Sequence, residues 1–240
     1  MYTKKFLIES SDVDARLNLK LASLFRMMQD VATEHAEQLD IGKANTIDKG
    51  LYWVITRYSV TIKRYPRYLE TVNVSTYPLG RNHFLFPRNF QVTSLDGEVL
   101  VTASSSWCIL DKKTHKIALH ALDNVKVPLE NYEWEEPSPY KIDISDATLV
   151  EKRKVRYSDI DLNGHLNNTR YIEYIVDSLG DEFHQKNIIT HIGINYDREI
   201  QNGQIVDIFQ KSADGVDLIQ GKVDDKNIFN CKICSKKVSE

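Results

Sequence analysis

Along this chain, apolar residues recur first at helical spacing and then in alternation with polar residues. Between residues 21 and 35 they return every three or four positions, which predicts one buried helix. Its apolar stripe consists of Leu21, Leu24, Phe25, Met28, Val31, Ala32 and His35. The stretches that follow alternate with a period of two, which predicts long antiparallel strands. They are 52–65, 71–79, 84–94 and 98–110.

The same succession occurs a second time in a shorter form. SDVDARLNLKLASLFRMMQD (11–30) aligns with SDIDLNGHLNNTRYIEYIVD (158–177) without a gap, and the serine, both aspartates and the closing aspartate coincide. A second buried helix is predicted from Tyr171, Ile172, Ile175, Val176 and Leu179, and strands are predicted in 187–200, 204–212, 216–223 and 228–238. A further strand opens each copy, at 4–11 and 151–159.

This order predicts an α+β protein made of two copies of one unit. An antiparallel β-sheet wrapped round a long central helix is the arrangement that buries such an apolar stripe. The stretch between the copies, HALDNVKVPLENYEWEEPSPYKID, is rich in proline and acidic residues and suits a surface linker. We therefore expect one domain at 1–118, a linker at 119–148 and a second domain at 149–240.

Composition narrows the class of protein. An apolar fraction of 42% indicates an ordered globular chain, and a net charge of −3 does not favour a nucleic-acid partner. No stretch approaches the roughly 18 to 20 uninterrupted apolar residues of a membrane span. The first residues reach charged side chains too soon for a signal peptide, and the three cysteines fit a reducing compartment, so we expect a cytoplasmic protein. Cys231 and Cys234 form a single CxxC pair, and we expect neither metal nor cofactor.

The two aligned segments differ in their polar side chains. The second copy has Asn163, Gly164, His165, Asn167 and Asn168 at the positions of Arg16, Leu17, Asn18, Lys20 and Leu21. Helix capping by an asparagine and a turn at the glycine account for part of this set. The surplus of Asp161, Asn163 and His165 calls for another reason. These three residues alternate, so an extended approach to the helix would point them into one small space.

That surplus suits acyl transfer to water. Histidine passes a proton near neutral pH, a carboxylate orients it or activates water, and an amide binds a carbonyl or a water. The free N–H groups of the helix start, at Asn167 and Asn168, can hold an oxyanion. The sequence has no GxSxG motif, and Cys108 falls in a predicted buried strand, so a serine or cysteine nucleophile is not supported.

The segment SDIDLNGHLNNTRYIEYIVD contains the pattern D.N.H.NN.RY, which is followed some thirty residues later by Y.RE in INYDREI, and these segments resemble the acyl-acyl carrier protein (ACP) thioesterases of bacteria and plant plastids. LASLFRMMQDVATEHAEQL, YWVITRYSVTIKRYP, ETVNVSTYP and ASSSWCILDKKT resemble the first domain of that family. The resemblance implies two tandem hot-dog domains and catalytic roles for Asp161, Asn163, His165 and Glu199. The plant pattern often has cysteine after this glutamate, whereas this chain has Ile200, which favours a carboxylate and a histidine that activate water. We expect no plastid transit peptide, in keeping with a bacterial-type enzyme.

The resemblance implies hydrolysis of fatty acyl-ACP to free fatty acid and ACP. A transient anhydride on a carboxylate is the mechanistic alternative. An acyl-CoA thioesterase, a hot-dog dehydratase and a non-catalytic acyl-binding module are the rival functions, and a homodimer stays open. The first domain is expected to hold the acyl chain, at Leu24, Phe25, Met27 and Met28. Because ACP is acidic, its contact residues are sought among basic side chains of that domain. The candidates are Lys63, Arg64, Arg67, Arg81, Arg88, Lys112, Lys113 and Lys116.

Overall fold

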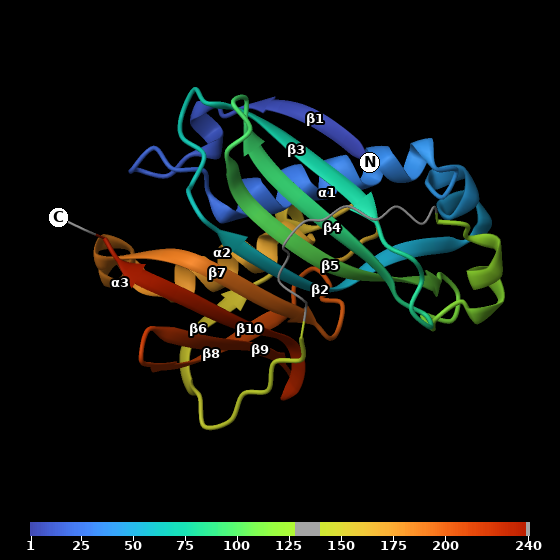
Figure 1. The fold of residues 1–240 in the computed structure, drawn as a ribbon. Coiled ribbons are helices and arrows are strands. Elements are labelled where there is room, and N and C mark those ends of the chain that lie inside the picture. The colour runs from blue at the N-terminus through green and yellow to red at the C-terminus, as the bar shows by residue number, and fades with distance from the viewer. Residues whose placement is uncertain (128–139, 239–240) are drawn as a thin grey trace. The chain divides into compact units, whose positions relative to one another are not determined.

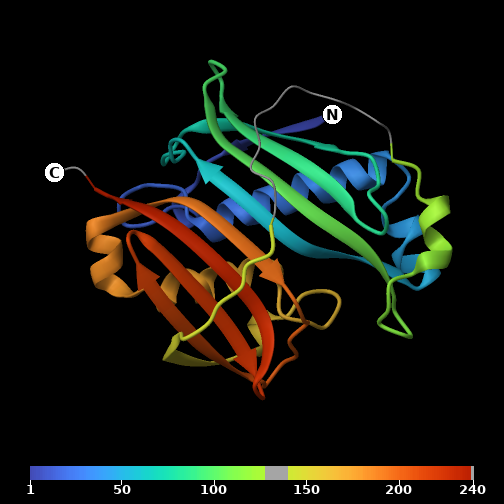
Figure 2. The same cartoon turned by 60° about the horizontal axis from the view of Figure 1, so that its bottom comes forward.

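The computed structural model describes residues 1–127 and 140–238. The chain divides into two compact units, Met1–Pro139 and Tyr140–Glu240, which we call unit 1 and unit 2. In each unit a helix lies along one face of an antiparallel sheet (Figure 1), and a second view is given in Figure 2. None of the helices in the described ranges is both long and apolar enough to cross a membrane.

Unit 1 contains the first predicted sheet and its helix. The strands lie in the order β1-β3-β4-β5-β2, and neighbouring strands are antiparallel. Their bounds are β1 Tyr2–Leu7, β2 Leu51–Ile62, β3 Thr71–Pro78, β4 Phe86–Ser94 and β5 Val99–Asp111, and the helix is α1, Leu21–Gln38. Short 3-10 helices occur at Ser10–Asp12, Lys43–Asn45, Ile47–Lys49 and Leu119–Asn124.

Helix α1 confirms the apolar stripe read from the sequence. All seven residues of that stripe are buried, and Met27 is buried with them. The helix contacts β1 and β3, so its buried face and the inward residues of the sheet form one core. Phe25 meets Tyr58 of β2 edge to face, with ring centroids 4.9 Å apart.

A smaller apolar cluster lies at the end of unit 1. Ala118, Ala121 and Leu122 pack with Leu51 and Phe86. Ala121 and Leu122 belong to the 3-10 helix Leu119–Asn124, which lies in the stretch 119–148 that was expected to be a linker. Residues 128–139 of that stretch lie outside the described residues.

Unit 2 repeats the topology of unit 1. Its strands lie in the order β6-β8-β9-β10-β7, so each strand occupies the place of its counterpart in the first sheet. Their bounds are β6 Thr148–Lys154, β7 Asn187–Tyr196, β8 Ile205–Ala213, β9 Val216–Val223 and β10 Lys226–Lys237. This repeat confirms the α+β class and the two copies predicted from the sequence.

The prediction of a single helix in the second copy is wrong. The segment forms α2, Asn168–Ser178, and then α3, Gly180–Lys186. Gly180 has φ 78°, a left-handed conformation that glycine adopts without a steric penalty and that interrupts a right-handed helix. Helix α1 has Thr33 at the aligned position and continues through it. Apolar spacing alone does not reveal such a break, because the stripe continues to Leu179.

Candidate active site

The residues before α2 form a tight loop rather than the extended approach expected from the sequence. The Asp161 carboxylate accepts hydrogen bonds from the backbone N–H of Asn163, at 2.8 Å, and from that of His165, at 3.3 Å. The Asp161 N–H donates to the His165 carbonyl at 2.8 Å, and Gly164 has φ 84°. The expectation of an extended segment is therefore wrong, because aspartate favours a turn closed by its own side chain.

Unit 1 contains the same loop. The Asp14 carboxylate accepts from the N–H groups of Arg16 and Asn18, both at 2.9 Å, and the Asp14 N–H donates to the Asn18 carbonyl. Leu17, at the position of Gly164, also has a positive φ, of 61°. The aspartate and its turn are therefore common to both copies and belong to the scaffold. The side chains carried by the loop differ.

The 161–165 loop brings His165 to Glu199. The two side chains approach at 3.2 Å between His165 Nε2 and Glu199 Oε2. Both are partly exposed, at 17% and 31% of their side-chain surface. Glu199 follows β7, and the Leu166 N–H donates to the Ile200 carbonyl at 2.8 Å, which ties the two segments together. A histidine and a carboxylate in contact at a solvent-accessible position can share and pass a proton.

Tyr171 of α2 is hydrogen-bonded to the segment that carries Glu199. Its hydroxyl donates to the Arg198 carbonyl at 3.3 Å. Burial raises the pKa of Tyr171, and the carboxylates of Glu199 and Asp161 raise it further. Its ring meets Tyr196 and Phe229 edge to face, at centroid distances of 5.2 and 5.7 Å. Tyr171 therefore supports the segment that carries Glu199, a role that the sequence did not separate from its place in the apolar stripe.

At the start of α2 the helix cap is Asn167 rather than Asn168, the other asparagine that could have served. Its side chain accepts from the Thr169 N–H at 2.9 Å, and its carbonyl accepts from the Arg170 N–H at 2.8 Å. Within the described part of the chain, the Asn168 N–H is then the first-turn donor that has no partner. Asn163 is exposed, and among the described residues its side-chain amide has no hydrogen-bond partner. Both groups are free to meet a substrate.

The residues expected to hold an acyl chain are all in the core of unit 1. Leu24, Phe25, Met27 and Met28 are each exposed by 2% or less. Leu24 and Phe25 are bulky, and Met27 and Met28 carry flexible thioethers.

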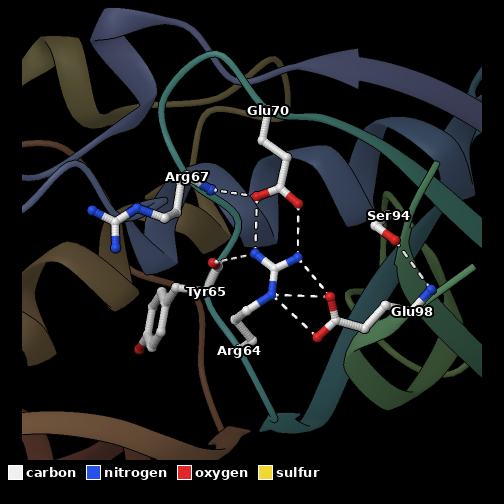
Figure 3. Close-up of polar contacts among 6 residues, drawn as sticks. All are labelled: Arg64, Tyr65, Arg67, Glu70, Ser94 and Glu98. Atoms are coloured by element: carbon white, nitrogen blue, oxygen red, sulfur yellow. Dashed lines mark hydrogen bonds and ion pairs between the residues drawn. The ribbon is translucent and has the colours of Figure 1, made fainter. Parts of the chain in front are cut away.

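The basic residues expected to contact ACP differ in their surroundings. Arg88 is only 6% exposed and contacts His35 and Thr76, so the prediction of a surface contact at this residue is wrong. It occupies an inward position of β4, and burial lowers the pKa of Arg88 to about 10. Arg64 is held by Glu70 and Glu98 (Figure 3).

The remaining candidates are exposed. Arg81 is paired with Asp123 at 3.1 Å. The others are Lys63, Arg67, Lys112, Lys113 and Lys116.

Two units that each set a helix against an antiparallel sheet make this chain a tandem hot-dog protein. Models of the acyl-ACP thioesterase N-terminal domain and the acyl-ACP thioesterase C-terminal domain match residues 1–126 and 143–237. The chain belongs to the acyl-ACP thioesterase family.

Solved structures agree with this assignment. The structure of an acyl-ACP thioesterase from Bacteroides thetaiotaomicron is 26% identical, with a TM-score of 0.87, and the match covers 98% of this chain and 97% of that one. The 12:0-ACP thioesterase from Umbellularia californica has a TM-score of 0.83 at 18% identity, with 99% and 97% covered, and shows the shared fold.

Plant proteins are similar to this chain over most of its length. The chloroplastic dodecanoyl-[acyl-carrier-protein] hydrolase of Cinnamomum camphora is 25% identical over 83% of this chain and 56% of its own length. The chloroplastic oleoyl-acyl carrier protein thioesterase 2 of Arabidopsis thaliana is 25% identical over 86% and 61%. The chain thus spans little more than half the length of these relatives.

Proposed function

We propose that this protein hydrolyses the thioester between a fatty acyl chain and ACP, releasing the free fatty acid and the carrier thiol. The observation that carries the proposal is the 3.2 Å contact between His165 and Glu199 in unit 2. Unit 1 has Asn18 in place of His165. Its Leu19 N–H donates to the Pro66 carbonyl as the Leu166 N–H donates to that of Ile200, so Tyr65 stands in place of Glu199. Asparagine and tyrosine cannot act as a histidine–carboxylate pair. Family membership supplies the class of substrate.

In the proposed reaction, His165 and Glu199 take a proton from water, and the resulting hydroxide attacks the thioester carbonyl carbon. Negative charge develops on the carbonyl oxygen, where the Asn168 N–H at the start of α2 donates to it. The carbon–sulfur bond then breaks, and the proton held by the pair goes to the departing thiolate. Asn163 binds the water or the carbonyl through its exposed amide.

Asp161 acts as a positioning residue in this scheme. Its carboxylate accepts from two backbone N–H groups and thereby fixes the loop that carries Asn163 and His165. It holds the imidazole in place through the backbone. A direct attack by the Glu199 carboxylate, giving a mixed anhydride, is the alternative first step. Single turnover in oxygen-18 water tests this route, since label enters the Glu199 carboxylate only when an anhydride forms and water opens it at the Glu199 carbonyl.

The test is a thioesterase assay with purified wild type, His165→Ala and Glu199→Gln. We expect each substitution to lower kcat by about 100-fold or more, in keeping with the usual contribution of general acid–base catalysis. Asn18→Ala alters the matching loop position of unit 1 and should leave kcat unchanged. Near-normal turnover in both unit 2 variants contradicts the proposed site. Faster turnover of acyl-CoA than of acyl-ACP by the wild type contradicts the proposed carrier.

The acyl chain completes the proposal. We assign its binding to the buried side chains of α1 in unit 1, where Met27 and Met28 give the most adaptable walls. Met28→Ala should shift the chain-length profile toward longer acyl groups. An unchanged profile, with only a loss of stability, makes Met28 an ordinary core residue.

A further inference from the structure

The connection that carries Glu199 has a counterpart in unit 1. There the N–H groups of Lys63 and Arg64 both donate to the Leu100 carbonyl, at 2.9 and 3.2 Å. In unit 2 the N–H groups of Asp197 and Arg198 both donate to the Ile228 carbonyl, at 2.8 and 3.2 Å. Arg198 therefore stands at the position of Arg64.

The end of the connection matches as well. The Ile8 N–H donates to the Glu70 carbonyl in unit 1, and the Val155 N–H donates to the Gln204 carbonyl in unit 2, both at 2.9 Å. Gln204 is therefore the counterpart of Glu70. Lys226 precedes Ile228 by two residues, as Glu98 precedes Leu100, which makes Lys226 the counterpart of Glu98.

In unit 1 the charge of this arginine is compensated by Glu70 and Glu98, and we call these three residues the Arg64 clamp. The Arg64 guanidinium donates to both carboxylate oxygens of Glu70, at 2.9 and 3.0 Å, and to both of Glu98, at 2.9 to 3.2 Å (Figure 3). Hydrogen bonds to the two carboxylates raise the pKa of Arg64. Bidentate pairing on two sides leaves this cation no capacity for another anion.

In unit 2 both carboxylates are replaced. Gln204 keeps one hydrogen bond of Glu70. Its side-chain oxygen accepts from the Gln201 N–H at 2.7 Å, and the Glu70 carboxylate accepts from the Arg67 N–H at 2.9 Å. Gln204 carries no charge, and the residue at the position of Glu98 is the cation Lys226. Arg198 is exposed, and no ion pair joins its guanidinium to the described residues.

The uncompensated arginine adjoins the proposed active site. Arg198 directly precedes Glu199, and the Tyr171 hydroxyl holds its carbonyl at 3.3 Å. The neighbouring acid Asp197 accepts from the side-chain amides of Asn227 and Asn230. The second copy thus keeps the backbone hydrogen bonds of the Arg64 clamp and exposes its arginine to solvent, one residue before Glu199 in the chain.

We propose that Arg198, together with Lys226, binds the phosphate of the prosthetic arm that carries the acyl thioester. This inference rests on the proposed function, because both ACP and coenzyme A carry their thiol on a pantetheine arm that ends in a phosphate. A guanidinium that has lost its internal carboxylates is suited to bidentate recognition of such an oxyanion. Arg198 is then a carrier-binding residue and takes no part in the bond-breaking step.

The experiment compares one acyl group on three carriers: ACP, coenzyme A and N-acetylcysteamine, which lacks phosphate. We expect Arg198→Gln to lower kcat/KM about tenfold or more with ACP and coenzyme A, mainly through KM. Turnover of the N-acetylcysteamine thioester should stay unchanged. Arg64→Gln, the matched change in unit 1, should leave kcat/KM for all three carriers unchanged.

A second variant rebuilds the clamp round the intact arginine. Gln204→Glu combined with Lys226→Glu restores both carboxylates and should reproduce the carrier dependence of Arg198→Gln. An equal loss of kcat/KM with all three carriers means that Arg198 positions Glu199. A loss with ACP alone means that Arg198 contacts carboxylates of the carrier protein. Either result, or no loss at all, overturns the proposal. If the wild type hydrolyses none of the three thioesters, the proposed function itself fails.

Discussion

His165 Nε2 lies 3.2 Å from Glu199 Oε2, although the loop that carries this histidine is closed by the same hydrogen bonds as a loop of unit 1 that carries none. The scaffold of the site therefore does not depend on its catalytic side chains, since it exists in both copies. Comparison of the two copies separates residues that shape the loop from residues that can act on a substrate.

Asp161 and Asp14 give the first prediction. Each carboxylate accepts from two backbone N–H groups, so Asp161→Ala and Asp14→Ala should each lower the free energy of unfolding by about 1 to 3 kcal/mol. Only Asp161→Ala should also lower kcat, because only its loop carries a histidine. Urea unfolding and the thioesterase assay measure the two effects.

Asp161→Asn is the control for this prediction. Asparagine keeps an oxygen acceptor and can close the same turn, so kcat should return close to that of the wild type. If Asp161→Asn is as inactive as Asp161→Ala, the negative charge of Asp161 takes part in the chemistry and the positioning role is wrong.

Periodicity predicted most of the architecture. In β9 buried and partly exposed residues alternate strictly. Such a strand can be predicted because each residue's polarity shows which face of the sheet it occupies. The break at Gly180 was not, because it depends on one backbone conformation inside a continuing stripe. The turn at Asp161 was misread as extended, because a polar alternation looks the same in a strand and in a loop closed by side chains.

The site was predictable only in part. His165 and its neighbours stood out because the aligned first copy lacks them. Glu199 came from the family resemblance, since one acid among charged residues after a strand carries no distinguishing pattern. Its approach to His165 depends on the long-range bond between Leu166 and Ile200. Arg88 was predicted at the surface and is buried. The register of β4 turns this position inward, and register is not visible in the sequence around a single charged residue.

Gly221 gives a second prediction. It is paired with Phe229 across β9 and β10, and a β-carbon at Gly221 would overlap the Phe229 ring. Gly221→Ala should therefore lower the free energy of unfolding by about 1 to 3 kcal/mol. It should also lower kcat, because Phe229 packs against Tyr171, which supports the segment before Glu199.

Gly193 provides the matched control for Gly221. It lies in β7 of the same sheet, and a β-carbon there meets its nearest neighbour, Ile142, at an ordinary 3.5 Å. Gly193→Ala should be close to the wild type in both thermal denaturation and turnover. Equal stability of the Gly221 and Gly193 variants contradicts the steric argument.

The Arg64 clamp gives a prediction about pH. Hydrogen bonding to Arg64 holds the pKa of Glu70 below its ordinary value of 4.5. A lowered folded-state pKa stabilises the protein above the unfolded-state value, and this contribution is lost as the pH falls through the folded-state pKa. Arg64→Gln should therefore be less stable than the wild type at pH 7, by about 1 kcal/mol for the partly exposed Arg64–Glu70 pair.

The measurement is denaturant unfolding of the wild type and Arg64→Gln from pH 7 to pH 3. The two stability curves should converge below about pH 4.5, where Glu70 becomes protonated. Added salt should narrow the difference at pH 7. A constant gap at every pH contradicts an electrostatic origin and assigns the effect to lost packing of the arginine stem.

Lys112 and Lys113 give the last prediction, which concerns the carrier protein. Both are exposed in the turn after β5, and we propose that they attract the acidic surface of ACP. Lys112→Glu combined with Lys113→Glu should raise KM for acyl-ACP severalfold at low salt and leave acyl-CoA turnover unchanged. Lys236→Glu combined with Lys237→Glu makes the same change in net charge at the exposed end of β10 and should leave KM unchanged. Equal effects of the two pairs mean that overall charge, rather than a contact at Lys112 and Lys113, governs the encounter.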